Sequence, residues 1–366
     1  MLIHNNKYGS YEVASSNAAR AARQKMEGLI DAGQAKAAGL FNTLHNSVPK
    51  DRLVSPNAMK FSVNGHFNLL VQDERFDLHK HARGQVIDAT NGLMTRKVAE
   101  SMQEAGPWGQ EMLSNVLNTI YANIGKDKML LREVGGQVRA VLSNRYRRMD
   151  SAPIIESFAG ACGSLGAVPI EAHKTDTKWA LKVLLPVVFE PVQNEVMAYG
   201  AVLENSDFGD GALSLRTFML RLWCTNYAIR EEALRQVHLG RRLDDSMMFS
   251  SQTYDLDTRA MGSAIQDIVR GLLSPVRVQK DLALIKAANE QSIDASKVID
   301  GLHKANQLNK EETKEVSTVY NSAEVELLPP GNSLWRLSNA LSLFAQSRED
   351  GRRLELERLA GSVLAR

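Results

Sequence analysis

Two short runs of alternating apolar residues flank an Asn-Gly pair, and they constrain the fold more than any other feature of the chain. In the stretch MKFSV-NG-HFNLLV, an apolar side chain recurs at every second position: Met59, Phe61 and Val63 before the pair, and Phe67, Leu69 and Val71 after it. Asn64-Gly65 suits a two-residue type I′ turn, because both central positions of that turn need a positive φ. The pattern therefore predicts an antiparallel hairpin over residues 59–71.

A second hairpin is predicted over residues 168–185, around the turn Thr175-Asp176-Thr177. In its second strand Trp179, Leu181, Val183 and Leu185 alternate with Lys178, Ala180 and Lys182, which predicts one buried face and one solvent-exposed face. A helix over residues 150–163, with Asp150 or Ser151 as its N-cap, is expected to cross this sheet. Further strands are predicted over residues 137–143, 195–203 and 213–225.

The rest of the chain favours helix. Residues 11–44 are Ala-rich with small, sparse apolar side chains, which predicts a helix that is either a mobile arm or a segment ordered by a neighbouring subunit. The Pro-containing stretch over residues 46–57 is predicted to be a linker. Helical spacing of apolar residues predicts helices over 76–89, 94–104, 107–122, 231–239, 257–272, 278–290, 295–306, 310–321 and 333–364, the last with a break near Asp350.

Strands and helices are therefore segregated along the chain rather than alternating, which predicts an α+β fold. We expect an antiparallel sheet with packed helices in the centre, a helical N-terminal arm and a mostly helical C-terminal region. A length of 366 residues is typical of two or three domains. The predicted division is an arm over 1–50, an α+β core over 51–245 and a helical region over 246–366.

Composition excludes several classes of protein. The 44 Lys and Arg residues nearly balance the 42 Asp and Glu residues, which excludes a uniformly basic protein and an acidic disordered one. Two cysteines, Cys162 and Cys224, exclude a disulfide scaffold and are expected to be core residues. No apolar run is long enough for a signal peptide or a membrane span, so we expect a cytoplasmic protein.

No catalytic or cofactor motif is present. The sequence lacks GxxxxGK[ST], GxSxG and HExxH, so we expect no catalytic residue, cofactor, metal ion or small-molecule substrate. His79 and His81 are too far apart around a helix to share a metal. In the loop NSDFGDG, Asp207 and Asp210 could bind Mg²⁺, although the same residues suit a plain turn between strands.

The densest basic cluster lies between residues 128 and 148, where six cations stand against Glu133 alone. Arginine holds phosphate through planar, bidentate donors, and an interleaved tyrosine can stack on a base. The candidate nucleic-acid-binding residues here are Arg139, Arg145, Tyr146, Arg147 and Arg148. The alternative is an exposed turn whose arginines pair with neighbouring carboxylates.

A second basic set follows in the region of residues 216–242. A charge in an apolar strand must be paired or must reach solvent or a ligand, and Arg216 and Arg221 lie in such a strand. The set comprises Arg216, Arg221, Arg230, Arg235, His238, Arg241 and Arg242. Of these, the proposed binding residues are Arg216, Arg221, His238, Arg241 and Arg242, and ordinary ion pairs with Glu231, Glu232, Asp244 or Asp245 are the alternative.

These same segments resemble the phage/plasmid-related protein family of unknown function. LREVGGQVRAVLSNRYRRMDS is similar to a family strand that runs into a Ser-x-Arg-Tyr-Arg turn, here 143–147. NSDFGDGALSLRTFMLRLWCTN ends in the family's Arg-x-x-Cys-Thr-Asn, here 221–226, and RQVHLGRR carries a His-x-Gly at 238–240. The family often has Gly after Cys-Thr-Asn, where this chain has Tyr227. The resemblance covers roughly residues 76–245 and implies carriage on prophages, phages or plasmids, without a settled biochemical role.

Three functions are compatible with these features. The first is a phage- or plasmid-encoded nucleic-acid-binding protein, such as a single-strand DNA annealing or recombination-accessory protein, acting as a homo-oligomer in the bacterial cytoplasm. The second is a structural or protein-interaction factor of a phage that does not bind DNA. The third is a metal-dependent nuclease that uses Asp207 and Asp210. The near-zero net charge excludes none of them, because residues 311–326 hold five Glu residues against Lys314 and offset the basic cluster.

Overall fold

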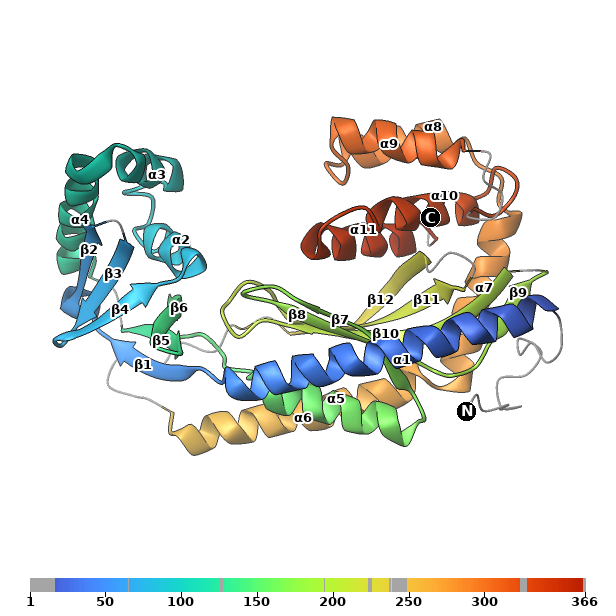
Figure 1. Cartoon of the computed structure of the whole chain (residues 1–366), viewed down its shortest axis with the longest axis horizontal. Coiled ribbons are helices and arrows are strands. Elements are labelled where there is room, and N and C mark those ends of the chain that lie inside the picture. Colours follow the sequence, from blue (N-terminus) through green and yellow to red (C-terminus); the bar gives the residue numbers. More distant parts are fainter. Residues whose placement is uncertain are drawn as a thin grey trace.

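The chain forms two separate sheets, each covered by helices. The computed structural model describes residues 17–64, 66–125, 128–193, 195–222, 226–236, 238, 249–322 and 328–364. It shows an N-terminal helix, two mostly antiparallel sheets with helices and a helical C-terminal region, which confirms the predicted α+β class. The strands divide between two sheets where the sequence analysis placed one (Figure 1).

The first sheet is built from residues 50–143 and has the strand order β1-β5-β6-β4-β3-β2. The pair β4–β6 is parallel and the other pairs are antiparallel. Its strands are β1 (Lys50–Val54), β2 (Met59–Asn64), β3 (His66–Val71), β4 (Glu74–Leu78), β5 (Met129–Val134) and β6 (Gln137–Ser143). Its helices are α2 (Lys80–Asp88), α3 (Arg96–Glu104) and α4 (Gly106–Asn123), with a 3-10 turn η2 over Pro56–Ala58.

The first predicted hairpin is confirmed: β2 and β3 pair from Met59↔Val71 to Asn64↔His66. Two neighbouring predictions are wrong. The predicted linker over 46–57 contains β1, which pairs with β5 and so lies at the edge of the sheet. The predicted helix over 76–89 begins as β4 and becomes helical only at Lys80, because alternating Phe76 and Leu78 are buried in the sheet.

The second sheet has the order β12-β11-β10-β8-β7, with β9 paired to β10. The second predicted hairpin is confirmed as β7 and β8. The strands are β7 (Val168–Lys174), β8 (Trp179–Leu184), β9 (Phe189–Val192), β10 (Glu195–Asn205), β11 (Leu213–Arg221) and β12 (Asn226–Gln236). The predicted helix over 231–239 is wrong, because residues 226–236 pair with β11 instead; of residues 237–239, only His238 is described.

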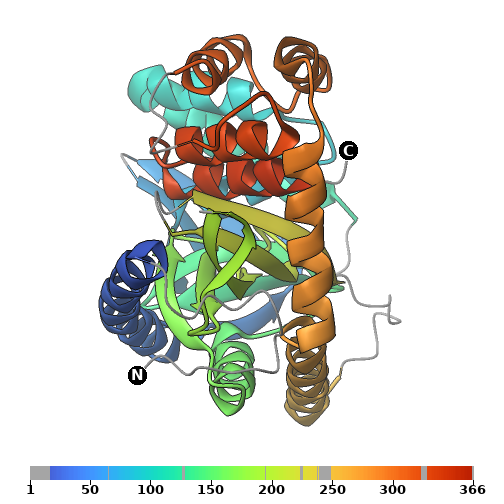
Figure 2. The same ribbon diagram turned by 90° about the vertical axis from the view of Figure 1, so that its right-hand side faces the viewer.

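Helices cover both faces of this sheet in successive layers. In Figure 2, α10 and α11 lie between the sheet and the outer pair α8 and α9, while α5 and α6 lie on the opposite side. The helices are α1 (Asn17–Asn46), α5 (Ser151–Ser164), α6 (Ser251–Leu272), α7 (Pro275–Glu290), α8 (Ala295–Lys304), α9 (Lys310–Tyr320), α10 (Leu334–Ala345) and α11 (Asp350–Val363). The helices predicted after residue 257 are confirmed, including the break before Asp350.

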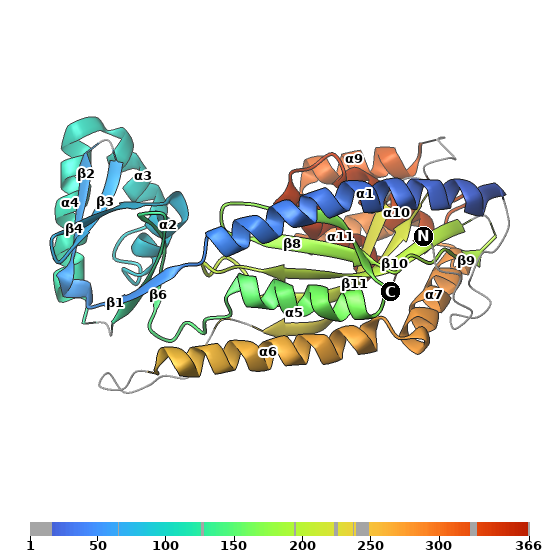
Figure 3. The same cartoon turned by 60° about the horizontal axis from the view of Figure 1, so that its bottom comes forward.

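The N-terminal helix is not a free arm over the part that the structure describes. α1 packs against β7 at the edge of the second sheet, and Figure 3 shows it running alongside that sheet. The Met26 and Leu40 side chains of α1 are buried. Gly33 makes this close packing possible, since a Cβ at that position would lie 2.2 Å from the Cα of Ile170. The prediction of a mobile or partner-ordered arm is therefore wrong for residues 17–46, and residues 11–16 lie outside the described part.

Both faces of β8 are buried, which corrects the predicted solvent-exposed face. Lys182 Nζ is fully buried and donates to Glu171 Oε2 at 2.9 Å and to Glu357 Oε2 at 2.7 Å. Arg353 of α11 pairs with the same two glutamates, and Lys182 Nζ lies 3.7 Å from the ring centroid of Tyr227. Lys182, which the sequence pattern placed on the solvent-exposed face of the strand, is therefore buried and connects the sheet to α11.

The buried apolar residues form separate core clusters, and each cluster uses a different part of the chain. One cluster uses residues between 54 and 141, while the largest joins α1 residues such as Leu44 to residues between 149 and 364. The predicted domain boundaries at 50 and 245 stay a prediction. Cys162 is buried in α5, and Cys224 lies outside the described residues. None of the described helices combines the length and the hydropathy that crossing a membrane requires.

Candidate functional site

The Arg-Tyr-Arg-Arg segment begins where β6 ends, at the junction between the two sheets. Tyr146 is buried, and its ring stacks on the ring of His238 with centroids 4.8 Å apart and an interplanar angle of 6°. Its hydroxyl donates to the carbonyl of Ser206 at 3.1 Å. Burial raises the pKa of the Tyr146 phenol. The structure therefore brings Tyr146 and His238 together, as two buried rings stacked on each other.

Two arginines of this segment are held by acidic side chains. Arg147 makes a bidentate pair with Asp257 of α6, with both contacts at 2.6 Å. Arg148 Nε lies 2.7 Å from Asp51 Oδ2, and its guanidinium stacks 3.9 Å from the ring centroid of Tyr254. These contacts match the alternative in which the arginines of the turn pair with carboxylates.

Arg145 differs from its neighbours. Its side chain is exposed and pairs with no carboxylate among the described residues. Arg139, on β6, is half-buried, donates to the carbonyl of Asp176 at 3.4 Å and lies over the ring of Phe208. Arg145 is thus the arginine of the turn whose charge is available to a ligand.

A buried charge cluster beneath the turn explains the local fold. Arg132 of β5 is fully buried and pairs with Asp51 and Asp150, and it also donates to the carbonyl of Asp207 at 2.8 Å. Because Asp150 binds Arg132, its side chain does not cap α5, although it occupies the predicted N-cap position. Asp207 does the capping: its Oδ1 accepts from the backbone N–H of Ser151 at 2.9 Å and from the Ser151 hydroxyl at 2.7 Å.

The two loop carboxylates are therefore committed to structural contacts. Burial raises the pKa of Asp207 to about 6, against the opposing effect of the Arg132 charge. Asp210 accepts from the Thr177 hydroxyl and lies 3.3 Å from Lys178 Nζ. No group of three or more His, Cys, Asp or Glu residues suited to a metal occurs in the described part of the chain. His79 accepts from the backbone N–H of His81 and caps α2.

The remaining candidates of the second basic set have different environments, and two of them are buried with protein partners. Arg221 is buried and makes a bidentate pair with Glu195, at 2.6 and 2.8 Å, and Trp335 Nε1 donates to the same carboxylate. His238 lies 2.9 Å from the carbonyl of Arg147 and 3.0 Å from Asn205 Oδ1. Burial lowers the pKa of His238 to about 4, so its ring is neutral at physiological pH. Arg241 and Arg242 lie outside the described residues.

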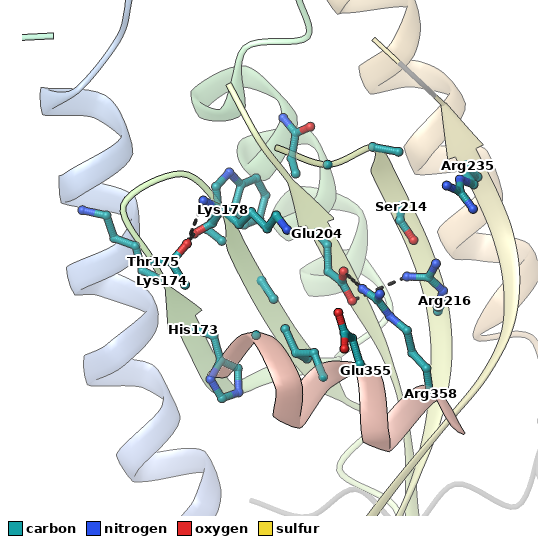
Figure 4. Close-up of a pocket in the computed structure, with 17 residues that line it drawn as sticks. His173, Lys174, Thr175, Lys178, Glu204, Ser214, Arg216, Arg235, Glu355 and Arg358 are labelled. Carbon is teal, nitrogen blue, oxygen red and sulfur yellow. Dashed lines mark hydrogen bonds and ion pairs between the residues drawn. The ribbon is translucent and has the colours of Figure 1, made fainter. Parts of the chain in front are cut away.

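Arg216 instead lines a pocket of about 240 Å³ between the second sheet and α11 (Figure 4). In Figure 4, the guanidinium groups of Arg216 and Arg358 both point toward the carboxylate of Glu204, with Lys178 and Thr175 at the end near the β7–β8 turn. Glu204 Oε1 is 3.5 Å from Arg216 Nη1, and Arg358 pairs with Glu204 Oε2. Five cationic side chains line the pocket against two glutamates: Lys174, Lys178, Arg216, Arg235 and Arg358, with Glu204 and Glu355.

A second pocket, of about 410 Å³, adjoins the first. Leu142 and Ser143 from the end of β6 line it, together with Tyr146 from the turn that follows and with His238. Gly211, Ala212 and Arg235 line both pockets. We call the two pockets together the groove. It connects the predicted turn at 143–148 to Arg216, which links the two basic segments of the sequence.

Lys174, Lys178 and Arg358 were missed as site residues by the sequence analysis. Lys174 and Lys178 flank the predicted turn at 175–177, so a basic hairpin end was visible in the sequence. Arg358 carries no such signal, because α11 begins about 175 residues after that turn and reaches the pocket only through the fold.

Comparison with protein-family models, with curated proteins and with solved structures finds no match to this chain.

Proposed function

We propose that this chain is a nucleic-acid-binding protein of a phage or plasmid that holds single-stranded DNA along the groove and acts as a homo-oligomer. A recombination-accessory or strand-annealing role is the concrete form of this proposal. The expected resemblance of residues 76–245 to a family of mobile elements motivates this proposal but stays a prediction, since no family model matches the chain. The geometry of the groove supports it.

The observation that carries the proposal is a set of three cations without acidic partners. Lys174 and Arg235 line the groove, and Arg145 precedes Tyr146, which also lines it. All three cations are exposed, and none of them pairs with a carboxylate among the residues that the structure describes. Exposed, unpaired cations along a groove are typical of surfaces that follow a phosphate backbone. The described carboxylates nearby are already engaged with other partners, so they leave these three charges uncompensated.

The test measures binding of single- and double-stranded DNA across a salt series. The variant Arg145→Ala/Lys174→Ala/Arg235→Ala is compared with Lys304→Ala/Lys310→Ala/Lys314→Ala, which removes three exposed charges on α8 and α9. Each lost phosphate contact reduces the slope of log K against log salt by roughly 0.7 for a single strand. We expect a reduction of about 2 in the groove variant and none in the control.

The outcomes separate the hypotheses. If the wild-type chain binds neither DNA at low salt, the proposal fails and a structural or protein-interaction role replaces it. If the two triple variants lose affinity equally, the DNA lies elsewhere on the molecule. Particle mass in the same buffer tests the homo-oligomer, and a monomer with and without DNA would contradict that part.

A further inference from the structure

We propose that the groove is one continuous track on which a single strand crosses the second sheet, and that Gly211 keeps this track open between the two pockets. This inference rests on the proposed binding of single-stranded DNA. It adds the path of the strand and the length of strand that the groove holds, and it gives a role to a residue that carries no charge.

The 240 Å³ pocket runs across the strands of the second sheet rather than along them. Five of its lining residues are paired in register, one each from β7, β8, β10, β11 and β12: His173, Ala180, Glu204, Ser214 and Arg235. Residues that are paired directly across a sheet lie on the same face. Neighbouring strands are about 4.8 Å apart, so this row spans roughly 19 Å.

The row forms a trough because two of its side chains are small and the next row is covered. Ala180 and Ser214 leave space above the sheet, and Leu354 of α11 lines the same space from the opposite side. In the next row Lys182 and Val202 are paired with each other and are fully buried. The trough is therefore closed on that side, and a strand can follow it only across the sheet.

Gly211 and Ala212 line both pockets, so they form the passage between them. The fold does not require a glycine at 211, because its φ is not positive and a Cβ there would meet Lys178 Cε at 3.6 Å, an ordinary contact. Gly209 differs: its φ is +75°, and a Cβ would lie 2.6 Å from Leu142 Cδ2. The missing side chain at 211 thus leaves space in the passage rather than relieving strain.

Exposed cations stand at both ends of the row. Arg235 lies where the two pockets meet, and Lys174 lies at the β7–β8 end. Glu204, in the middle, is paired with Arg216 and Arg358, so its charge is compensated. A stacked strand rises about 3.4 Å per nucleotide, so the row holds at most about six nucleotides. This length is within the range of roughly 4–16 nucleotides that known single-strand-binding modules cover.

The test measures the Kd of the full chain for deoxythymidine oligonucleotides of different lengths across a salt series. In the wild type we expect affinity to rise steeply up to about eight nucleotides, since the row holds about six and the adjoining pocket extends it. Gly211→Leu should weaken the binding of longer oligonucleotides and reduce the slope of log K against log salt by at least roughly 0.7, the value for one phosphate contact. Ala212→Leu obstructs the same passage and should act in the same way.

Gly301→Leu is the matched control, because Gly301 lies on α8 and also has open space around it. It should change neither the affinity nor the salt slope. A double-mutant cycle separates an obstructed track from a damaged fold. Lys174→Ala should cost about one phosphate contact in the wild type and none in Gly211→Leu, because the obstructed strand stays in the 410 Å³ pocket.

The outcomes distinguish this inference from the proposed function. If Gly211→Leu and Ala212→Leu bind long oligonucleotides as the wild type does, the track is overturned while the proposed function stands. The same holds if Lys174→Ala has its full effect in the Gly211→Leu background. If the wild type binds no oligonucleotide at low salt, the proposed function fails as well.

Discussion

Arginines that are equivalent in the sequence have very different environments in the fold. Arg221 is buried in a bidentate pair with Glu195, whereas Arg145 is exposed and forms no ion pair with a described residue. Removing one partner of a buried pair leaves an uncompensated charge, at a cost of about 3–5 kcal/mol, whereas an exposed charge contributes little to stability. These two arginines therefore separate a structural role from a binding role.

We expect Arg221→Met to lower the free energy of unfolding by about 3–5 kcal/mol, because Glu195 would stay buried with Trp335 as its remaining partner. Arg145→Ala should change it by less than about 0.5 kcal/mol and should weaken DNA binding. Urea denaturation gives both free energies. Equal stability losses in the two variants would contradict this assignment.

The buried carboxyl of Asp207 predicts a pH dependence of stability. Its pKa is about 6 in the folded protein, raised by burial, against about 4 in the unfolded chain. The folded state therefore binds the proton more tightly, and the contribution of this group to stability falls as the pH rises from about 4 to 6. The fall is on the order of 3 kcal/mol, from a pKa difference of about two units at roughly 1.4 kcal/mol per unit.

Asp207→Asn tests that dependence, because an amide keeps the acceptor for Ser151 but does not titrate. The stability of the wild type relative to the variant should decrease between about pH 4 and pH 6 and stay constant above. Denaturant titrations at several pH values measure the difference. A difference that rises with pH in this window would mean that the carboxyl is stabilised in its charged form.

At the scale of elements, the packing of α1 on β7 depends on the missing side chain of Gly33. Replacing a helical Gly with Ala normally stabilises by about 1 kcal/mol. At Gly33, however, the new Cβ would collide with the backbone of Ile170, so we expect Gly33→Ala to destabilise by more than the helix gains. Gly28 and Gly39 have open space around them, and Ala at either site should stabilise. Thermal midpoints of the three variants check the sign.

Elements with a strong local pattern were predictable from the sequence, and those defined by distant partners were not. The hairpin at 59–71 and the helices after 257 follow from local alternation or helical spacing. In contrast, REEALRQ favours helix locally, yet β12 forms because residues 226–236 pair with β11 and are covered by α11. Likewise, Lys50–Val54 resembles a linker because β5, which makes it a strand, comes about 75 residues later.

The candidate site was likewise only partly predictable from the sequence. The sequence identified Arg145 and Arg216 by their charge in or beside a strand; Arg216 lines the groove, and Arg145 is exposed next to Tyr146, which lines it. It could not distinguish them from Arg147, Arg148 and Arg221, because their partners lie between 26 and 110 residues away. Local charge thus indicates candidates, and the fold decides which of them remain available.

At the scale of the whole molecule, Arg132 joins parts that are distant in sequence. Its partners lie on β1, at the start of α5 and in the loop after β10. We expect Arg132→Met to lower the free energy of unfolding by at least about 3–5 kcal/mol, since the carboxylates of Asp51 and Asp150 would lose their common cation and the buried carbonyl of Asp207 would lose a donor. A matched control is Arg96→Met, which removes an exposed pair with Asp88 and should cost less than about 1 kcal/mol. Similar losses in both variants would contradict a central role for Arg132.

The largest hydrophobic cluster includes Leu44 from α1 and Val363 from α11. Lys182, in the middle of the sheet, has Glu357 of α11 as one of its two buried acceptors. Because a ribosome releases the chain from its N-terminal end, all strands of the second sheet emerge before α11. Until α11 follows, Lys182 has only Glu171 of its two buried acceptors. The first sheet can close once residue 143 has emerged, whereas the second waits for residues beyond 357. Nascent chains stalled shortly before and after that point should differ sharply in protease resistance, which makes the last helix the step that commits the protein to its native state.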